Sequence, residues 1–173
     1  MAKAGANSKR FIQISDCHLG PLTSEALLGL NTDESLHDVL SLIASKESNF
    51  DYMVCTGDIA SAGHDACYRR FVSIVRQYFS EPLAWLPGNH DSAEIMSNIE
   101  LPQIPEARAI EQGNWLILLL NSVVPFKVHG NFEQGELDTA SRLVRRAIEV
   151  APGAAEYHWT LANILHACGR LPE

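Results

Sequence analysis

Polar residues capable of metal binding or proton transfer follow three apolar segments of this chain, at the point where each segment ends. The segments are 11–15, 52–56 and 83–86, and their composition predicts short β-strands. The polar residues that follow them are Asp16, His18, Asp58, Asn89, His90 and Asp91. Open α/β sheets place their ligands at the carboxyl ends of their strands. We therefore expect these side chains to converge at one edge of a sheet.

Helical patterns separate the three predicted strands. A loop is expected between Leu19 and Leu30. Asn31, with Glu34 three positions later, predicts the capped start of a helix whose apolar face includes Val39. A second amphipathic helix is expected over 66–79, with Arg69 and Arg70 largely outward. Strands that alternate with helices through short connections indicate a parallel α/β sheet. A short helix to Asn98 and a hairpin with arms 107–111 and 115–121 are expected to follow.

The three polar motifs share their order and spacing with one known family. Asp16-Cys17-His18, Gly57-Asp58 and Gly88-Asn89-His90-Asp91 resemble the motifs of calcineurin-like metallophosphoesterases, and more narrowly those of the class III cyclic-nucleotide phosphodiesterase branch. The resemblance covers roughly residues 9–130. It implies the N-terminal part of a two-sheet α/β sandwich, followed here by an α-helical tail.

The resemblance also implies a set of metal ligands. Asp16 and His18 would hold a first metal ion. Asp58 would bridge to a second ion, which Asn89 would also bind. Two divalent ions about 3.5–4 Å apart activate a bridging water and neutralise charge on phosphoryl oxygens. Carboxylate, imidazole and amide ligands without a thiolate suit manganese, iron or zinc.

The resemblance implies that His90 and Asp91 act on the substrate side of the site. His90 would face the substrate as proton donor or oxyanion stabiliser, and Asp91 would orient it. The implied reaction is metal-dependent hydrolysis of a small phosphodiester. A cyclic nucleotide is favoured by the branch, while glycerophosphodiesters and nucleotide-lipid esters stay open.

The family pattern continues with further histidines and a Gly-His-x-His motif, which this sequence does not contain. His129 precedes a glycine but has no second histidine two places on, and His158 and His166 lie in helical patterns. We expect none of the three to bind a metal. One divalent ion, or none, should therefore bind well, and hydrolysis should be impaired.

A helical repeat offers an interpretation of the C-terminal segment. Gly135-Glu136-Leu137 and Gly169-Arg170-Leu171 lie one tetratricopeptide period apart, about 34 residues. The repeat positions between them are filled in order by Ala140, Val144, Ala147, Pro152, His158, Leu161, Ala162 and Leu165. The alternative is that 136–150 is the helix that phosphoesterases ordinarily carry here, which leaves 155–173 unexplained.

The predicted organisation has three parts. Residues 1–9 form a disordered tail, 10–130 an incomplete metallophosphoesterase domain, and 134–173 an incomplete tetratricopeptide-like segment. The junction at 128–135 would arise by natural fusion, by rearrangement or as an artefact. The tail offers a surface for a protein partner, so a non-catalytic scaffold is the alternative function, and a truncated product without function is a third.

Composition limits the classes of partner. A net charge of −8 argues against a nucleic-acid binder, because such domains usually carry a basic patch. The longest apolar run, 115–120, is far shorter than the roughly 20 residues that span a bilayer. Four cysteines without paired spacing indicate reduced thiols and a cytoplasmic protein.

Overall fold

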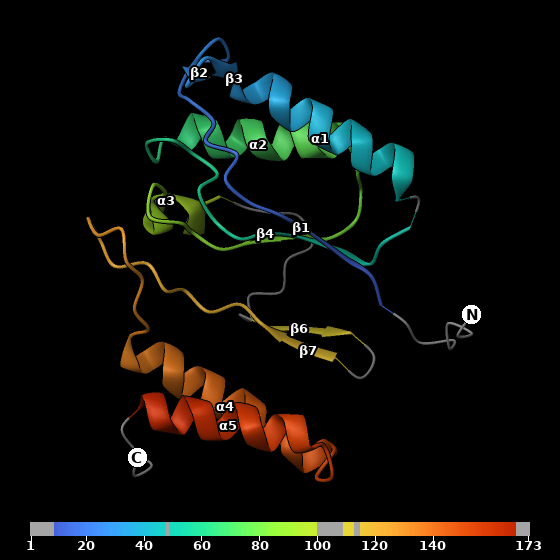
Figure 1. Ribbon diagram of the computed structural model, residues 1–173, viewed down its shortest axis with the longest axis vertical. Coiled ribbons are helices and arrows are strands. Elements are labelled where there is room, and N and C mark those ends of the chain that lie inside the picture. The colour runs from blue at the N-terminus through green and yellow to red at the C-terminus, as the bar shows by residue number, and fades with distance from the viewer. Residues whose placement is uncertain (1–8, 48, 100–108, 113–114, 169–173) are drawn as a thin grey trace. The chain divides into compact units, whose positions relative to one another are not determined.

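The computed structural model describes residues 9–47, 49–99, 109–112 and 115–168. Contacts divide the chain into two compact units, Met1–Glu106 and Ala107–Glu173 (Figure 1). This division does not follow the predicted domain boundaries, which stay predictions. Most of the predicted N-terminal tail lies outside the described residues, and its last residue, Lys9, forms a 2.9 Å ion pair with Asp51.

A parallel sheet organises the first unit. Strands β1 (Phe11–Ile14), β4 (Tyr52–Cys55) and β5 (Leu83–Trp85) lie in the order β1-β4-β5, and both pairings are parallel. The register aligns the last residues of the three strands. The predicted strands and their parallel arrangement are thus confirmed, and the loops that follow them start at a common level.

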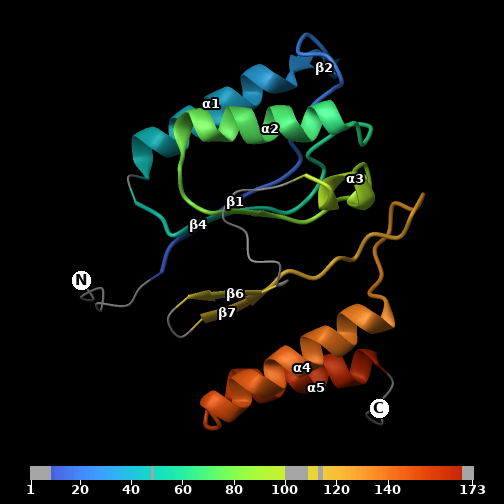
Figure 2. The same ribbon diagram turned by 180° about the vertical axis from the view of Figure 1, so that it is seen from behind.

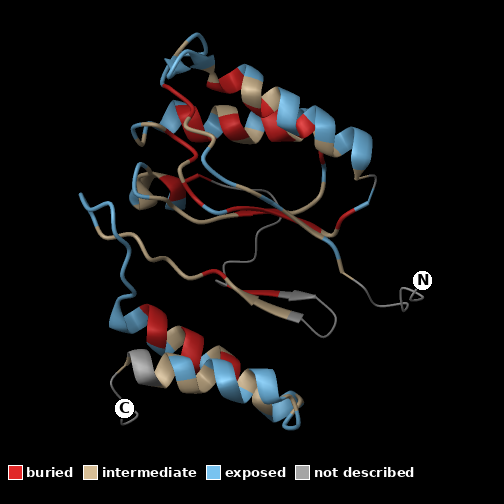
Figure 3. Ribbon diagram, in the orientation of Figure 1, coloured by how far each residue is buried: buried red, intermediate tan, exposed pale blue. Residues whose placement is uncertain are grey.

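Two helices cover one face of this sheet. Helices α1 (Thr32–Lys46) and α2 (Asp65–Tyr78) lie side by side over it, as both views show (Figures 1 and 2). Leu40 and Phe71 are fully buried in the shared core (Figure 3). Val39, predicted on the buried face of the first helix, is instead 44% exposed.

The central strand is the most deeply buried of the three. Every residue of β4 is buried, whereas Gln13 of β1 is exposed. The apolar character of the run 11–15 predicts a strand covered on both faces, and this is wrong for Gln13, whose side chain is exposed on one face of β1. Its glutamine amide donates to the Thr56 hydroxyl at 2.9 Å.

A small hairpin precedes α1 where the sequence predicted only a loop. Strands β2 (Ala26–Leu27) and β3 (Leu30–Asn31) pair antiparallel across a two-residue turn. Leu28 and Gly29 have φ values of 51° and 86°, as a type I′ turn requires. The hairpin delivers Asn31 to the start of the helix.

The predicted helix cap is confirmed. The Asn31 side-chain oxygen accepts hydrogen bonds from the backbone nitrogens of Asp33 and Glu34, at 3.1 and 3.2 Å. These bonds satisfy donors that the first helical turn leaves without an internal partner.

A short helix, α3 (Ala93–Ser97), follows β5 and the third polar motif, in agreement with the predicted short helix. Its N-cap is Ser92, whose hydroxyl accepts from the Ile95 nitrogen at 3.3 Å.

The second unit contains a hairpin and two helices. Strands β6 (Ala109–Gln112) and β7 (Trp115–Leu118) pair antiparallel, in agreement with the predicted hairpin, whose turn at 113–114 lies outside the described residues. Helices α4 (Gln134–Val150) and α5 (Ala155–Ala167) pack against each other. In the described part of the chain, no helix is both long and apolar enough to cross a membrane.

Arg70 joins the two helices of the first unit, although the sequence predicted that it faces solvent. Its Nε lies 2.6 Å from Asp33 Oδ1, and its guanidinium also donates to the Gly20 carbonyl. Only 16% of the Arg70 side chain and 12% of the Asp33 side chain are exposed. The neighbouring Arg69 pairs with Asp65 across a surface where both side chains are more than half exposed.

Arg70→Met should therefore destabilise the first unit far more than Arg69→Met. Removing the guanidinium leaves the Asp33 carboxylate without its partner at a largely buried position, a loss of about 3–5 kcal/mol. The exposed Arg69 pair is screened by solvent and contributes little to stability. Urea unfolding followed by circular dichroism measures both, and equal midpoints for the two variants would contradict this assignment.

Candidate metal centre

Backbone hydrogen bonds join the first two polar motifs beyond the ends of their strands. The Asp16 nitrogen donates to the Gly57 carbonyl at 3.0 Å, and the His18 nitrogen donates to the Asp58 carbonyl at 2.8 Å. The pairing thus continues after β1 and β4 have ended. It holds the side chains of the two motifs at a fixed separation.

Three of the predicted ligands have left-handed backbone conformations. The φ values are 57° at Asp16, 46° at His18 and 50° at Asp58. Aspartate and histidine adopt this region more readily than most residues, though still at some energetic cost. Such conformations persist where the surroundings enforce them, and here the inter-motif hydrogen bonds do so.

The carboxylate of Asp91 fixes the third motif against the second. Its Oδ2 accepts from the nitrogens of Gly88 at 2.8 Å and Ile59 at 3.2 Å, and its Oδ1 accepts from Ala60 at 2.9 Å. These three contacts are to backbone nitrogens, and the carboxylate also forms a side-chain hydrogen bond with Tyr68. We therefore expect Asp91 to position two loops, and its predicted role in orienting the His90 imidazole stays a prediction.

His90 is oriented by a different group. Its Nδ1 lies 3.2 Å from the Ser61 carbonyl oxygen, which can only accept, so Nδ1 carries a proton. Its backbone nitrogen donates to Asp58 Oδ1 at 3.1 Å. The ring stands edge-on to that of His18, with centroids 5.1 Å apart. Sequence reasoning missed Ser61 because a carbonyl contact leaves no mark on residue type.

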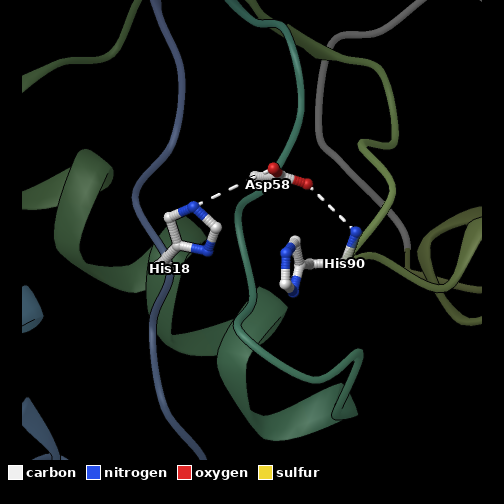
Figure 4. A group of neighbouring side chains, drawn as sticks. All are labelled: His18, Asp58 and His90. Carbon is white, nitrogen blue, oxygen red and sulfur yellow. Dashed lines mark hydrogen bonds and ion pairs between the residues drawn. The ribbon is translucent and has the colours of Figure 1, made fainter. Parts of the chain in front are cut away.

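The side chains of His18, Asp58 and His90 lie close to one another, while their assignment as ligands of particular ions stays a prediction (Figure 4). His18 Nε2 lies 3.8 Å from Asp16 Oδ1 and 3.9 Å from Asp58 Oδ2. Ligand atoms of His18, Asp58 and His90 all lie within 4.8 Å of one another. Metal bonds to these atoms are about 2.0–2.2 Å long, which places two ligands of one ion roughly 3–4.4 Å apart. The donor types and most of the separations therefore fit a divalent ion.

The structure says less about Asn89, the other predicted ligand, and about the histidines that were not expected to bind metal. Asn89 is exposed beside His90 in the third loop, and its role as a ligand stays a prediction. His129 and His158 lie in the second unit, where His158 Nε2 is 2.9 Å from the Pro152 carbonyl. Neither belongs to the metal-capable group found among the described residues.

Comparison with known proteins assigns this arrangement to a family. Residues 9–160 match the family described as calcineurin-like phosphoesterase. The chain belongs to this family. The match overlaps the predicted repeat segment up to residue 160, and the tetratricopeptide character of that segment stays a prediction.

Three relatives of this chain are named as cyclic-nucleotide phosphodiesterases. A 3',5'-cyclic adenosine monophosphate phosphodiesterase of Escherichia coli (strain K12) is 38% identical over 148 residues, 84% of this chain and 54% of that protein. Its counterpart in Pseudomonas aeruginosa is 34% identical over 140 residues, 81% and 50% of the two chains. A 3',5'-cyclic-nucleotide phosphodiesterase of Nostoc sp. is 33% identical over 131 residues, 73% and 47%. The chain spans about half the length of the curated relatives it matches.

Two buried groups near the candidate site have a raised pKa. The Tyr68 hydroxyl accepts from the Ser92 nitrogen at 2.7 Å. Burial raises the pKa of this tyrosine, and the charge of Asp91 adds to the effect. A hydrogen bond to Cys17, together with burial, raises the pKa of the Cys55 thiol. A neutral thiol is a poor metal ligand, which agrees with a site built from oxygen and nitrogen donors.

Gly88→Ala should displace Asp58, the predicted bridging ligand. A Cβ at this position would overlap a carboxylate oxygen and the backbone nitrogen of Asp58. We expect manganese affinity, measured by calorimetry, to fall at least as far as the 10–100-fold typical of losing an outer-shell partner. Gly135→Ala is the control, because nothing lies within 4 Å of a Cβ there. Unchanged affinity in the Gly88 variant would show that Asp58 does not bind the ion.

Asp91→Asn should loosen the same site without touching a ligand. An amide has one accepting oxygen, so at least one of the Gly88, Ile59 and Ala60 N–H groups loses its partner. We expect a loss of about 1–3 kcal/mol in unfolding free energy, together with weaker manganese binding. Glu94→Gln, an exposed acid on α3, is the matched control. Wild-type values of both quantities for Asp91→Asn would disprove the positioning role.

Proposed function

We propose that this chain carries a metal-dependent phosphodiesterase site whose substrates are small phosphodiesters, with 3',5'-cyclic nucleotides as the main class. The observation that supports this most is the convergence of Asp16, His18, Asp58 and His90 at the ends of parallel strands. The relatives named above supply the substrate class, since their names specify cyclic nucleotides.

The proposed metal ligands divide between two positions. Asp16 and His18 hold a first ion, and Asp58 is placed to bridge, because its Oδ2 faces His18 while its Oδ1 accepts from the third loop. When bound, divalent ions supply a metal-activated water as nucleophile and offset charge on the phosphoryl oxygens. Manganese, iron and zinc all suit these donors.

His90 contributes through its Nε2. Because Nδ1 donates to the Ser61 carbonyl, the neutral ring presents a lone pair at Nε2 and the protonated ring presents a donor there. A metal-bound histidine characteristically donates its other ring nitrogen to such a carbonyl. We propose instead that Nε2 of His90, when it is protonated, delivers a proton to the leaving alcohol.

The second position is the weaker one in this proposal. Its ligands from this chain are Asp58 and the exposed Asn89, so a second ion binds poorly and turnover is slow. We place the protein in the reducing cytoplasm, since all four cysteines are free thiols. A protein partner for α4 and α5 remains a separate prediction.

Manganese titration by calorimetry, run beside an activity assay, tests the proposal. We expect weak binding of one ion and slow hydrolysis of bis-(p-nitrophenyl) phosphate and cyclic AMP. Asp58→Asn keeps a residue that tolerates the left-handed backbone, and should lower turnover by more than about 10–100-fold. Asp38→Asn, an exposed residue of α1, should change neither quantity.

Two results would overturn parts of this proposal. Absence of metal-dependent hydrolysis at every manganese concentration would favour the scaffold function. Binding of two ions in the micromolar range would contradict the weak second position.

A further inference from the structure

A pocket of about 300 Å³ opens beside the metal ligands within the first unit. It lies between the β2–β3 hairpin and the first turns of α1, and both Asp16 and His18 line its inner end. The rest of its wall is largely aliphatic, with Leu27, Leu30 and Leu36 among the lining residues. A substrate whose phosphoryl group meets the metal ligands could therefore extend its organic group into this pocket.

One polar group in the pocket wall lacks a partner. Thr32 lines the pocket and is 5% exposed, and its hydroxyl oxygen has no hydrogen-bond partner among the described residues. A buried hydroxyl left unsatisfied is costly. The hydroxyl oxygen itself has almost no accessible surface in this structure, so a ligand would reach it only after the Thr32 side chain rotates toward the pocket.

The outer lip of the pocket carries backbone strain. Leu28 lines it, is fully exposed and has a φ of 51° in the hairpin turn. Asparagine or aspartate occupies this turn position at lower cost than leucine. A strained, exposed apolar residue of this kind is a reason to look for a functional contact.

We propose that this pocket binds the nucleobase of the substrate, an inference that rests on the proposed function. A base is flat and largely apolar on its faces, which suits a wall of leucines. Once the Thr32 side chain has rotated toward the pocket, the ring nitrogens and exocyclic groups of the base can pair with its hydroxyl. Apart from Asp16 and His18 at the metal end, no charged side chain is among the described residues that line the pocket, so a neutral group fits it. The volume is at the lower limit for ligand sites, enough for a single ring system.

Two positions on one exposed face of α1 give a matched test. Val39 lines the pocket and is 44% exposed, whereas Leu42 is 58% exposed and is not part of the lining. Val39→Trp should fill the pocket and raise the KM for cyclic AMP by about 10-fold or more. The same variant should leave hydrolysis of methyl p-nitrophenyl phosphate, which has no base, unchanged. Leu42→Trp should alter neither reaction.

Thr32→Val removes the hydroxyl and keeps the shape of the side chain. We expect it to raise the KM for cyclic AMP by roughly 3–10-fold, the value of one hydrogen bond, with the baseless ester unaffected. Equal effects on both esters would indicate a general structural role for Thr32 and would contradict base recognition.

Binding of adenosine separates this inference from the proposed function. Saturation-transfer NMR without added metal should show adenosine bound to the wild-type chain and to Leu42→Trp, but not to Val39→Trp. This measurement tests base binding by the pocket even if the chain hydrolyses no phosphodiester. Failure of adenosine to bind the wild-type chain, or equal binding by Val39→Trp, would overturn the assignment of the pocket while leaving the phosphodiesterase proposal intact.

Discussion

The metal centre depends on hydrogen bonding between a single carboxylate and the backbone of two loops. Asp91 accepts from Ile59 and Ala60 in the loop after β4, and from Gly88 in the loop after β5. Parallel strands bring loop starts to one edge but do not determine how the loops turn from there. The hydrogen bonds of Asp91 fix how the two loops turn, and they bring the backbone nitrogen of His90 to Asp58.

The parts of this fold that sequence predicts well are those determined by local interactions. A continuous apolar run predicts the strand β4, and Asn31 predicts the start of α1. Both predictions succeed because a buried strand and a helix cap each depend on a few adjacent residues. The position of Asp16 and Asp58 at strand ends is likewise visible in the order of residue types. For these reasons the sheet, and the closeness of His18 to Asp16 and Asp58, could be predicted before any coordinates.

The features that sequence failed to predict depend on distant contacts. Gln13 belongs to a run that looks buried, and only the strand order shows that β1 lies at an edge. The role of Arg70 depends on Asp33, which lies on another helix. The hairpin before α1 did have a local signal, since Leu28-Gly29 is an X-Gly pair between apolar residues, but leucine is an unusual choice for that turn. Asp91 was assigned to the His90 ring because nothing in the sequence indicates which backbone groups a carboxylate will meet.

The left-handed conformations of Asp16, His18 and Asp58 have a consequence for metal exchange. Fixing the backbone of a residue costs about 1–2 kcal/mol in conformational entropy, and for these three residues that cost is met by strand pairing and inter-loop hydrogen bonds. An incoming ion therefore has little ordering of the backbone to perform. In this respect the centre differs from a zinc finger, whose fold exists only with its metal. If the proposed ions bind here, a chelator would remove them while the sheet and the loops keep their conformation, and the site could then bind metal again.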